Sequence, residues 1–304
     1  MKASISRVMN WLRWPNLLIV FITLAFIRYG IIAPALRAEG IELELGTTSF
    51  LLLSLTTLLI TFGGYVINDI FDQETDAQNK GDHRAIGIWI SASEAWAIYL
   101  IIGFIGLIIA TYLAWAENKW QWLWIYPVAV LLLGWYSKRL KSGVLFGNLL
   151  VSVFCAGVAL LLPFSEMEAI AQMSEGNKMM QLLYFYAAFA GISNLLREII
   201  KDAEDIEGDR QAGLQTLPIK YGLNASRYWA LFIGILLCFG LIIFYLNVKS
   251  SSEWAKGFLF LTTPLLLAIL IGLAQKQSFI KWKTLSMLSK LLMLGGLVGM
   301  FFLI

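Results

Sequence analysis

Long stretches of apolar residues recur along the whole chain, and they restrict its fold more than any other feature. A run of about twenty apolar residues with few charges is long enough to cross a bilayer as a helix. Connections between the runs are short, which leaves no room for an attached soluble domain. The sequence predicts nine spans, near residues 15–36, 50–67, 95–115, 120–136, 143–164, 179–196, 228–246, 257–275 and 285–304.

The composition supports a membrane protein, because 59% of the 304 residues are hydrophobic and only 14% are charged. Soluble domains carry about 25% charged residues. We therefore expect an all-α polytopic protein, a single transmembrane domain over residues 1–304 around a central cavity, with no nucleic-acid partner. The first run is too long for a cleavable signal peptide. Two cysteines in separate spans and one histidine exclude a disulfide framework and a His-rich metal centre.

The charges predict how the chain is oriented. With nine spans, the N-terminus and the loops after even-numbered spans share one face, which holds sixteen lysines and arginines. The opposite face holds five, namely Arg37, Lys119, Lys178, Lys249 and Lys256. Cytoplasmic loops carry the excess of Lys and Arg. The pattern favours a cytoplasmic N-terminus, in the cell (inner) membrane.

Aspartate is distributed unevenly, since all seven aspartates lie in two loops of the predicted cytoplasmic face. The first cluster places Asn68, Asp72 and Asp76 four residues apart, which stacks them on one helical face. The second places Asp202, Asp205 and Asp209 at i, i+3, i+7 spacing, again one face. Like charges at these spacings repel each other. A divalent cation between the carboxylates removes that penalty.

Oxygen ligands without His or Cys select a hard cation, and Mg²⁺ prefers a few carboxylates together with phosphate oxygens. Two such helices facing each other across a cavity would hold Mg²⁺ against a diphosphate. The simpler alternative is a pair of acidic helix ends solvated at the membrane surface. Two clusters on the same predicted face, four spans apart, favour the metal-binding interpretation.

The spacing of Asn68, Asp72 and Asp76, with Asp205-x-x-x-Asp209, resembles the two signature motifs of the UbiA superfamily of intramembrane prenyltransferases. The resemblance covers the whole chain, because it includes nine spans with motifs after spans two and six. It implies that these motifs bind Mg²⁺ and a prenyl diphosphate. By this resemblance the expected metal ligands are Asn68, Asp72, Asp76, Asp202, Asp205 and Asp209, with Asn68 also contacting substrate.

A basic loop follows the fourth predicted span and contains Tyr136, Lys138, Arg139 and Lys141. Its cations are either ordinary membrane anchors or clamps for the departing diphosphate, whose charge must be neutralised. The stretch resembles the family's Tyr-Ser-x-x-Leu-Lys segment, which favours the clamp role for Tyr136 and Lys141. We expect Tyr136 and Lys138 to bind substrate and Arg139 and Lys141 to act in catalysis.

Polar residues also lie inside predicted spans, and they face either a cavity or a partner helix. Asn148 and Ser152 lie four residues apart in the fifth span, Asn194 lies in the sixth, and Arg28 is a charge within the first. Helix packing is the alternative for the three neutral residues. We expect Asn148 to bind substrate.

The segment from Arg197 to Gly222 indicates the acceptor. It most resembles the branch that makes archaeal-type ether lipids by transferring geranylgeranyl to geranylgeranylglyceryl phosphate. Within this segment we expect Arg197 and Lys201 to bind substrate. An aromatic acceptor, as in quinone or chlorin biosynthesis, is the alternative. His83 departs from the Asn that relatives often carry there.

The expected reaction forms an allylic cation that a hydroxyl of the acceptor captures. Asp69 and Asp202 are both candidate bases for the hydroxyl proton, and sequence alone cannot choose between them. A cation transporter is a remote alternative. It would place carboxylates at mid-membrane in broken helices, whereas these aspartates all lie at one predicted face.

Overall fold

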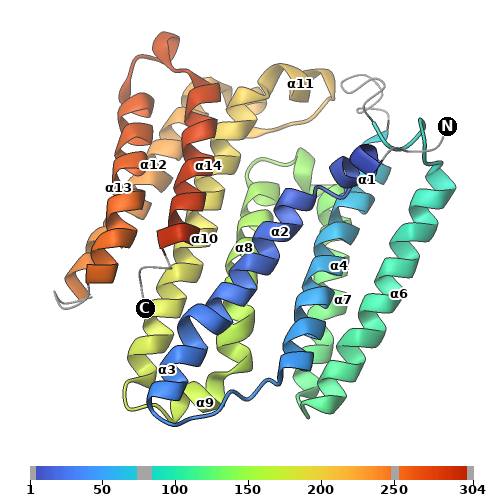
Figure 1. Cartoon of the computed structure of the whole chain (residues 1–304). Helices are drawn as coiled ribbons and strands as arrows, with labels where there is room; N and C mark the ends of the chain where they lie inside the picture. The colour runs from blue at the N-terminus through green and yellow to red at the C-terminus, as the bar shows by residue number, and fades with distance from the viewer. Residues whose placement is uncertain (1–4, 74–83, 248–252, 300–304) are drawn as a thin grey trace. The chain divides into compact units, whose positions relative to one another are not determined.

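The computed structural model describes residues 5–73, 84–247 and 253–299, which are helical with short connections (Figure 1). These residues form two compact units. Unit 1 comprises residues up to Leu24 together with Leu45–Leu140, and unit 2 comprises Ala25–Glu44 together with the chain from Lys141 onward. The first membrane-length helix, Trp14–Ala38, contributes to both.

Unit 1 contains α1, the start of the first span, and three long helices. Their bounds are α1 Ile5–Trp11, α2 Trp14–Phe26, α4 Thr47–Phe71, α6 Ala92–Ala116, η3 Trp120–Trp124 and α7 Ile125–Lys138. Unit 2 holds the remaining elements. They are η1 Ile27–Ile32, α3 Ala33–Ala38, η4 Leu140–Ser142, α8 Phe146–Ser165, α9 Met167–Ala171, α10 Gly176–Glu204, α11 Ile206–Gln211, α12 Leu217–Asn247, α13 Glu253–Ala274, η5 Gln277–Phe279 and α14 Trp282–Gly299.

Each predicted apolar run coincides with a helix among the described residues, and seven of these helices are long and apolar enough to span a bilayer. The protein is therefore a multi-pass membrane protein. Helix α7 has 14 residues, about 21 Å at 1.5 Å per residue. Helix α14 carries Lys283 and Lys290, which lower its apolar character. These two helices account for the difference between nine predicted spans and seven membrane-length helices.

Within unit 1, α1 packs onto α4 through an aromatic cluster. The Trp11 ring meets Phe62 edge-on at 5.3 Å and Trp89 at 5.6 Å. Beneath them lies a buried aliphatic cluster of Val66, Ile67, Ile70, Ile86, Ile90 and Ala95. This packing fixes the short N-terminal helix against the end of α4 that carries the first aspartate motif.

Helices α6 and α7 approach each other closely at Gly106. A Cβ on this residue would lie 2.2 Å from the Tyr126 hydroxyl, so no larger residue fits without displacement of the ring. That hydroxyl donates to the Gly103 carbonyl at 3.0 Å. Elsewhere α6 exposes Leu100, Ile101 and Phe104, as expected for a helix that faces lipid.

Unit 2 is organised around α10, which packs against α8, α12 and α14 (Figure 1). Its core is rich in aromatic rings. Phe185 and Phe244 stack at 4.2 Å, and Phe258 lies edge-on to Phe189 at 5.2 Å. Helix α12 is kinked at Gly222, whose φ of +81° is a left-handed conformation that glycine adopts without strain.

The charge inside the first span is paired within unit 2. Arg28 lies in the π-helical turn η1 and donates to Glu166 at 2.9 Å, with side-chain exposures of 2% and 0%. The second Glu166 oxygen accepts the backbone N–H of Glu44 at 2.7 Å. Removing one member of such a buried pair costs about 3–5 kcal/mol. Arg28 therefore has a buried structural partner at the end of α8.

Candidate active site

The first aspartate motif lies at the end of α4 in unit 1. Asn68 donates from its amide nitrogen to Asp72 Oδ2 at 2.7 Å, across one helical turn. Asp72 caps the helix, and its own N–H bonds to the Asn68 carbonyl. The two side chains are therefore gathered as the spacing predicts. Asp76 lies outside the described residues.

Asp69 is held differently from its neighbours in the motif. Arg13 donates to its Oδ1 at 2.9 Å, and the Trp11 indole donates to its Oδ2 at 3.1 Å. The guanidinium also lies 4.6 Å from the centre of the Tyr65 ring, in cation–π contact. Arg13 adopts a φ of +49°, which turns the chain between α1 and α2. Both carboxylate oxygens of Asp69 are thus engaged, one of them by a cation.

The basic loop follows α7. Tyr136 is half-buried, whereas Lys138, the last residue of α7, and Arg139, its C-cap, are exposed. Lys141 lies in the short turn η4 and is half-buried. Their charge lies at the end of α7, where cations are favoured by the helix dipole.

The second aspartate motif joins α10 to α11 in unit 2. Asp205 caps α10, and its carbonyl accepts the N–H of Asp209 at 2.9 Å. Asp209 accepts a hydrogen bond from the buried Thr216 hydroxyl at 3.3 Å. Partial burial raises the pKa of Asp209 above its usual value, and the Asp205 charge raises it further. A bound cation would relieve both effects.

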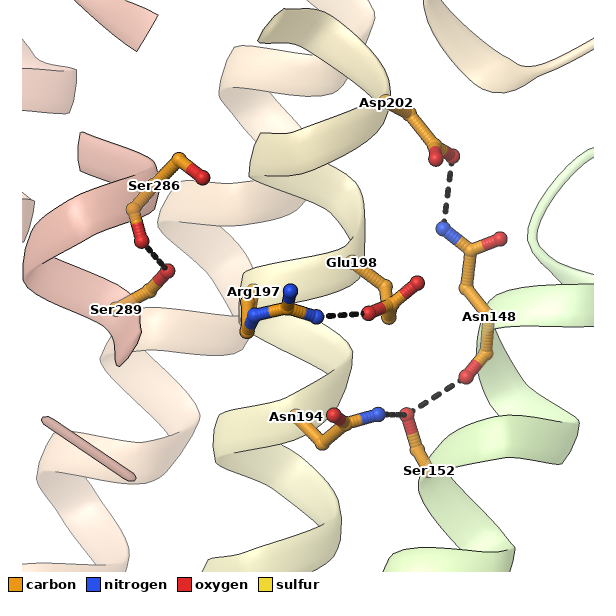
Figure 2. Close-up of polar contacts among 8 residues, drawn as sticks. All are labelled: Asn148, Ser152, Asn194, Arg197, Glu198, Asp202, Ser286 and Ser289. Atoms are coloured by element: carbon orange, nitrogen blue, oxygen red, sulfur yellow. Dashed lines mark hydrogen bonds and ion pairs between the residues drawn. The ribbon is translucent and has the colours of Figure 1, made fainter. Parts of the chain in front are cut away.

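Asp202 receives a hydrogen bond from a neighbouring helix. The amide nitrogen of Asn148, on α8, donates to Asp202 Oδ2 at 2.8 Å (Figure 2). One turn deeper, the Asn194 amide donates to the Ser152 hydroxyl at 3.2 Å, and that hydroxyl donates to the Asn148 carbonyl at 2.6 Å. The polar residues within these two spans therefore form one connected network between α8 and α10.

The two cations expected to bind substrate from α10 differ in their surroundings. Arg197 is partly buried and pairs with the adjacent Glu198. Lys201 is exposed near the end of the helix. Both lie on the segment that leads into the second motif.

The donor set at the motifs fits Mg²⁺. The candidate ligand atoms are carboxylate and amide oxygens, and they include no sulfur or imidazole nitrogen. In the part of the chain that the structure describes, no three Cys, His, Asp or Glu side chains form a metal-binding group by themselves. Mg²⁺ is usually held by one or two carboxylates plus substrate phosphate oxygens. A site of this kind is completed by its substrate.

Sequence reasoning assigned no role to several residues that contact the predicted set. Arg13 and Trp11 hold Asp69, Thr216 contacts Asp209, and Glu198 pairs with Arg197. Glu198 was detectable, because it lies four residues from both Asn194 and Asp202 on one helix face. The Arg13 contact joins residues 56 positions apart, and no local pattern indicates it.

The chain is similar to known proteins over most of its length. A digeranylgeranylglyceryl phosphate synthase from Methanopyrus kandleri is 33% identical over 219 residues, covering 71% of this chain and 73% of the relative. A solved structure described as concerning digeranylgeranylglyceryl phosphate synthase in membranes has a TM-score of 0.64 at 23% identity, covering 97% and 98% of the two chains.

A UbiA homologue from Archaeoglobus fulgidus, solved with GPP and Mg²⁺, has a TM-score of 0.57 at 16% identity and covers 97% of this chain and 99% of its own. These two structures show that the fold is shared. The family description "UbiA prenyltransferase family" matches residues 30–292, which include both aspartate motifs. The chain belongs to the UbiA prenyltransferase family.

Proposed function

We propose that this protein transfers a geranylgeranyl group from its diphosphate to geranylgeranylglyceryl phosphate, in a reaction that requires Mg²⁺. The observation that carries the proposal is the similarity to a digeranylgeranylglyceryl phosphate synthase over 71% of the chain. The related A. fulgidus structure, which holds GPP and Mg²⁺, supports a prenyl diphosphate donor and the metal.

The proposed metal ligands are the oxygen-bearing side chains of the two motifs. Bound Mg²⁺ neutralises diphosphate charge, which makes the diphosphate a better leaving group. The hydrogen bond from Asn68 to Asp72 supports a shared role for that pair, and the proximity of Asp205 to Asp209 supports the second pair. The full set is Asn68, Asp72, Asp76, Asp202, Asp205 and Asp209.

Cationic side chains receive the diphosphate in this proposal. Arg139 and Lys141 assist departure by offering positive charge to the leaving oxygens. The remaining proposed substrate contacts come from Asn68, Tyr136, Lys138, Asn148, Arg197 and Lys201. Half-burial of Tyr136 and Lys141 is consistent with these roles.

The reaction breaks the C–O bond between the allylic carbon and the diphosphate, and it forms a new C–O bond to a glycerol hydroxyl. The hydroxyl proton must pass to a base as the ether forms. Of the two aspartates that the sequence offers, the contacts favour Asp202, because only one of its oxygens accepts a hydrogen bond from a described residue, the Asn148 amide. Both oxygens of Asp69 already accept hydrogen bonds, one from Arg13 and one from Trp11.

We further propose the finer membrane arrangement. All nine helices that coincide with apolar runs cross the bilayer, with α7 and α14 included. The charge bias supports a cytoplasmic N-terminus and a reaction at the cytoplasmic face of the cell membrane. The family match over residues 30–292 draws on both units, which supports one functional domain over residues 1–304.

The test is an assay of membranes containing the protein, with Mg²⁺, radiolabelled geranylgeranyl diphosphate and either geranylgeranylglyceryl phosphate or an aromatic quinone precursor. We expect label in a glycerol diether, and no label with Asp72→Ala. Label only in the aromatic product would retain the reaction and replace the acceptor. Absence of Mg²⁺-dependent transfer from prenyl donors of several lengths would overturn the proposal.

A further inference from the structure

Three acidic or amide side chains form a stripe along α10. Asn194, Glu198 and Asp202 are spaced four residues apart, so they lie on one face of the helix. Asn148, on α8, faces this stripe and contacts Asp202 (Figure 2). The stripe lies within a membrane-length helix, where polar side chains are costly unless they are paired or functional.

At the Asn194 end of the stripe, hydrogen bonds through Ser152 hold Asn148 in place. The Ser152 hydroxyl accepts from Asn194 and donates to the Asn148 carbonyl, so both of its hydrogen-bonding roles are used. Ser152 and Asn194 are 4% exposed, which places them inside the protein. This support fixes the turn of α8 from which the Asn148 side chain projects.

Near the Asp202 end of the stripe, the side chains of Asn148 and Glu198 carry oxygens that can accept further hydrogen bonds. Among the described residues no group donates to the side-chain oxygen of Asn148, although this residue is 9% exposed. Figure 2 shows the Asn148 nitrogen directed at Asp202 and its oxygen turned away from α10. The Glu198 carboxylate projects from α10 toward the Asn148 side chain and pairs with Arg197 through one oxygen.

Helix packing alone does not account for this arrangement. Two direct side-chain hydrogen bonds already join α8 to α10, from Asn148 to Asp202 and from Asn194 to Ser152. Glu198 contributes to neither of them. An acidic side chain in a membrane span is a functional site by default when packing does not need it. The side-chain oxygens of Asn148 and Glu198 can each accept a hydrogen bond from a ligand that carries a donor.

We propose that Asn148 and Glu198 form the subsite for a hydrogen-bond donor on the second substrate, namely a free hydroxyl of a glycerol-type head group. The inference rests on the proposed transfer to a glycerol lipid and adds a specificity-determining residue, Glu198. The hydroxyl has a single hydrogen, which the side-chain oxygens of Asn148 and Glu198 share as acceptors in the bound substrate, and this hydrogen passes to Asp202 as the ether bond forms. Ser152 and Asn194 act as positioning residues, because they hold Asn148.

The test pairs variants with a deoxy acceptor, an analogue of geranylgeranylglyceryl phosphate in which hydrogen replaces the free hydroxyl. Its inhibition constant is compared with the KM of the true acceptor. Glu198→Leu removes the acceptor group, and we expect it to raise the acceptor KM about tenfold, the loss typical of one hydrogen bond to a charged group. The inhibition constant of the analogue and the KM of the prenyl diphosphate should stay unchanged.

Glu198→Gln keeps an acceptor oxygen and should restore most of the acceptor affinity, which also provides a second variant if the Leu variant does not fold. A matched pair of serine variants tests whether Ser152 positions Asn148. Ser152→Ala should raise the acceptor KM, whereas Ser165→Ala, which removes an equivalent bond to a carbonyl within α8, should not.

An equal rise in the KM of the acceptor and the inhibition constant of its deoxy analogue would overturn the subsite, because Glu198 would then act only on structure. The subsite would also be overturned if neither Glu198 variant changed the KM of the acceptor. Failure of the proposed function is seen separately, as absence of diether formation by the unmodified protein.

Discussion

The two aspartate regions hold their inner carboxylates in opposite ways. In unit 1, Asp69 is 8% exposed and is bonded by the Arg13 guanidinium and the Trp11 indole. In unit 2, Asp202 receives its hydrogen bond from the neutral amide of Asn148. Protein donors therefore engage both carboxylate oxygens of Asp69, whereas among the described residues only one oxygen of Asp202 accepts a hydrogen bond. We propose from this difference that Asp69 anchors the N-terminal segment, and it favours our proposal that Asp202 takes part in the reaction.

The largest effect that separates the two regions is expected in the rate of transfer. Asp202→Asn should lower kcat about 10²–10⁴-fold, the usual range when a general base is lost. Asp69→Asn should lower it about tenfold at most, as expected for a supporting contact outside the reacting atoms. Single-turnover transfer of labelled geranylgeranyl by the two purified variants measures this. Equal losses, or a greater loss for Asp69→Asn, would reverse the assignment.

Metal dependence provides the next comparison. Asp72→Asn in unit 1 and Asp209→Asn in unit 2 each remove a proposed Mg²⁺ ligand. We expect each to raise the half-saturating Mg²⁺ concentration about 10–100-fold, measured as transfer activity over a Mg²⁺ titration. Glu207→Gln, on the exposed face of α11, is the matched control and should leave the titration unchanged. If only one of the two aspartates shifts it, one motif alone holds the metal.

A smaller effect is expected on stability, and it is confined to unit 1. A double-mutant cycle with Arg13→Gln and Asp69→Asn should give a coupling energy of about 1 kcal/mol. The figure is modest because the Arg13 side chain is 35% exposed and its charge is screened by water. Apparent melting temperatures of the four proteins in one detergent provide the measurement. A coupling near zero would mean that the ion pair does not anchor the N-terminal segment.

The membrane helices and both motifs were predictable because they depend on local features. Long apolar runs predict membrane-length helices. The four-residue spacing of Asn68 and Asp72 predicts that their side chains meet across one helical turn. The length of α7 was harder to predict, because an apolar run does not reveal where a short helix such as η3 interrupts it. The nine-span count therefore stays a prediction.

Contacts between distant residues were not predictable from one sequence. Asn148 and Asp202 are 54 residues apart, and Arg28 and Glu166 are 138 apart. Each of these residues was noticeable as a polar group near or inside an apolar run. The choice of partner depends on how the helices pack, which spacing along the chain does not encode. The roles of the individual site residues stay predictions for the same reason.

The smallest expected effect concerns the neighbour of Asp209. Thr216 donates to Asp209 across 3.3 Å, a long hydrogen bond and therefore a weak one. Thr216→Val keeps the shape of this buried side chain and removes the donor, which should change the half-saturating Mg²⁺ concentration by only about twofold. Thr216→Ser keeps the hydroxyl and serves as the control in the same titration. A tenfold change with Val but none with Ser would mean that unit 2 fixes its metal ligand as firmly as unit 1 fixes Asp69, and the contrast between the regions would then be confined to Asp202.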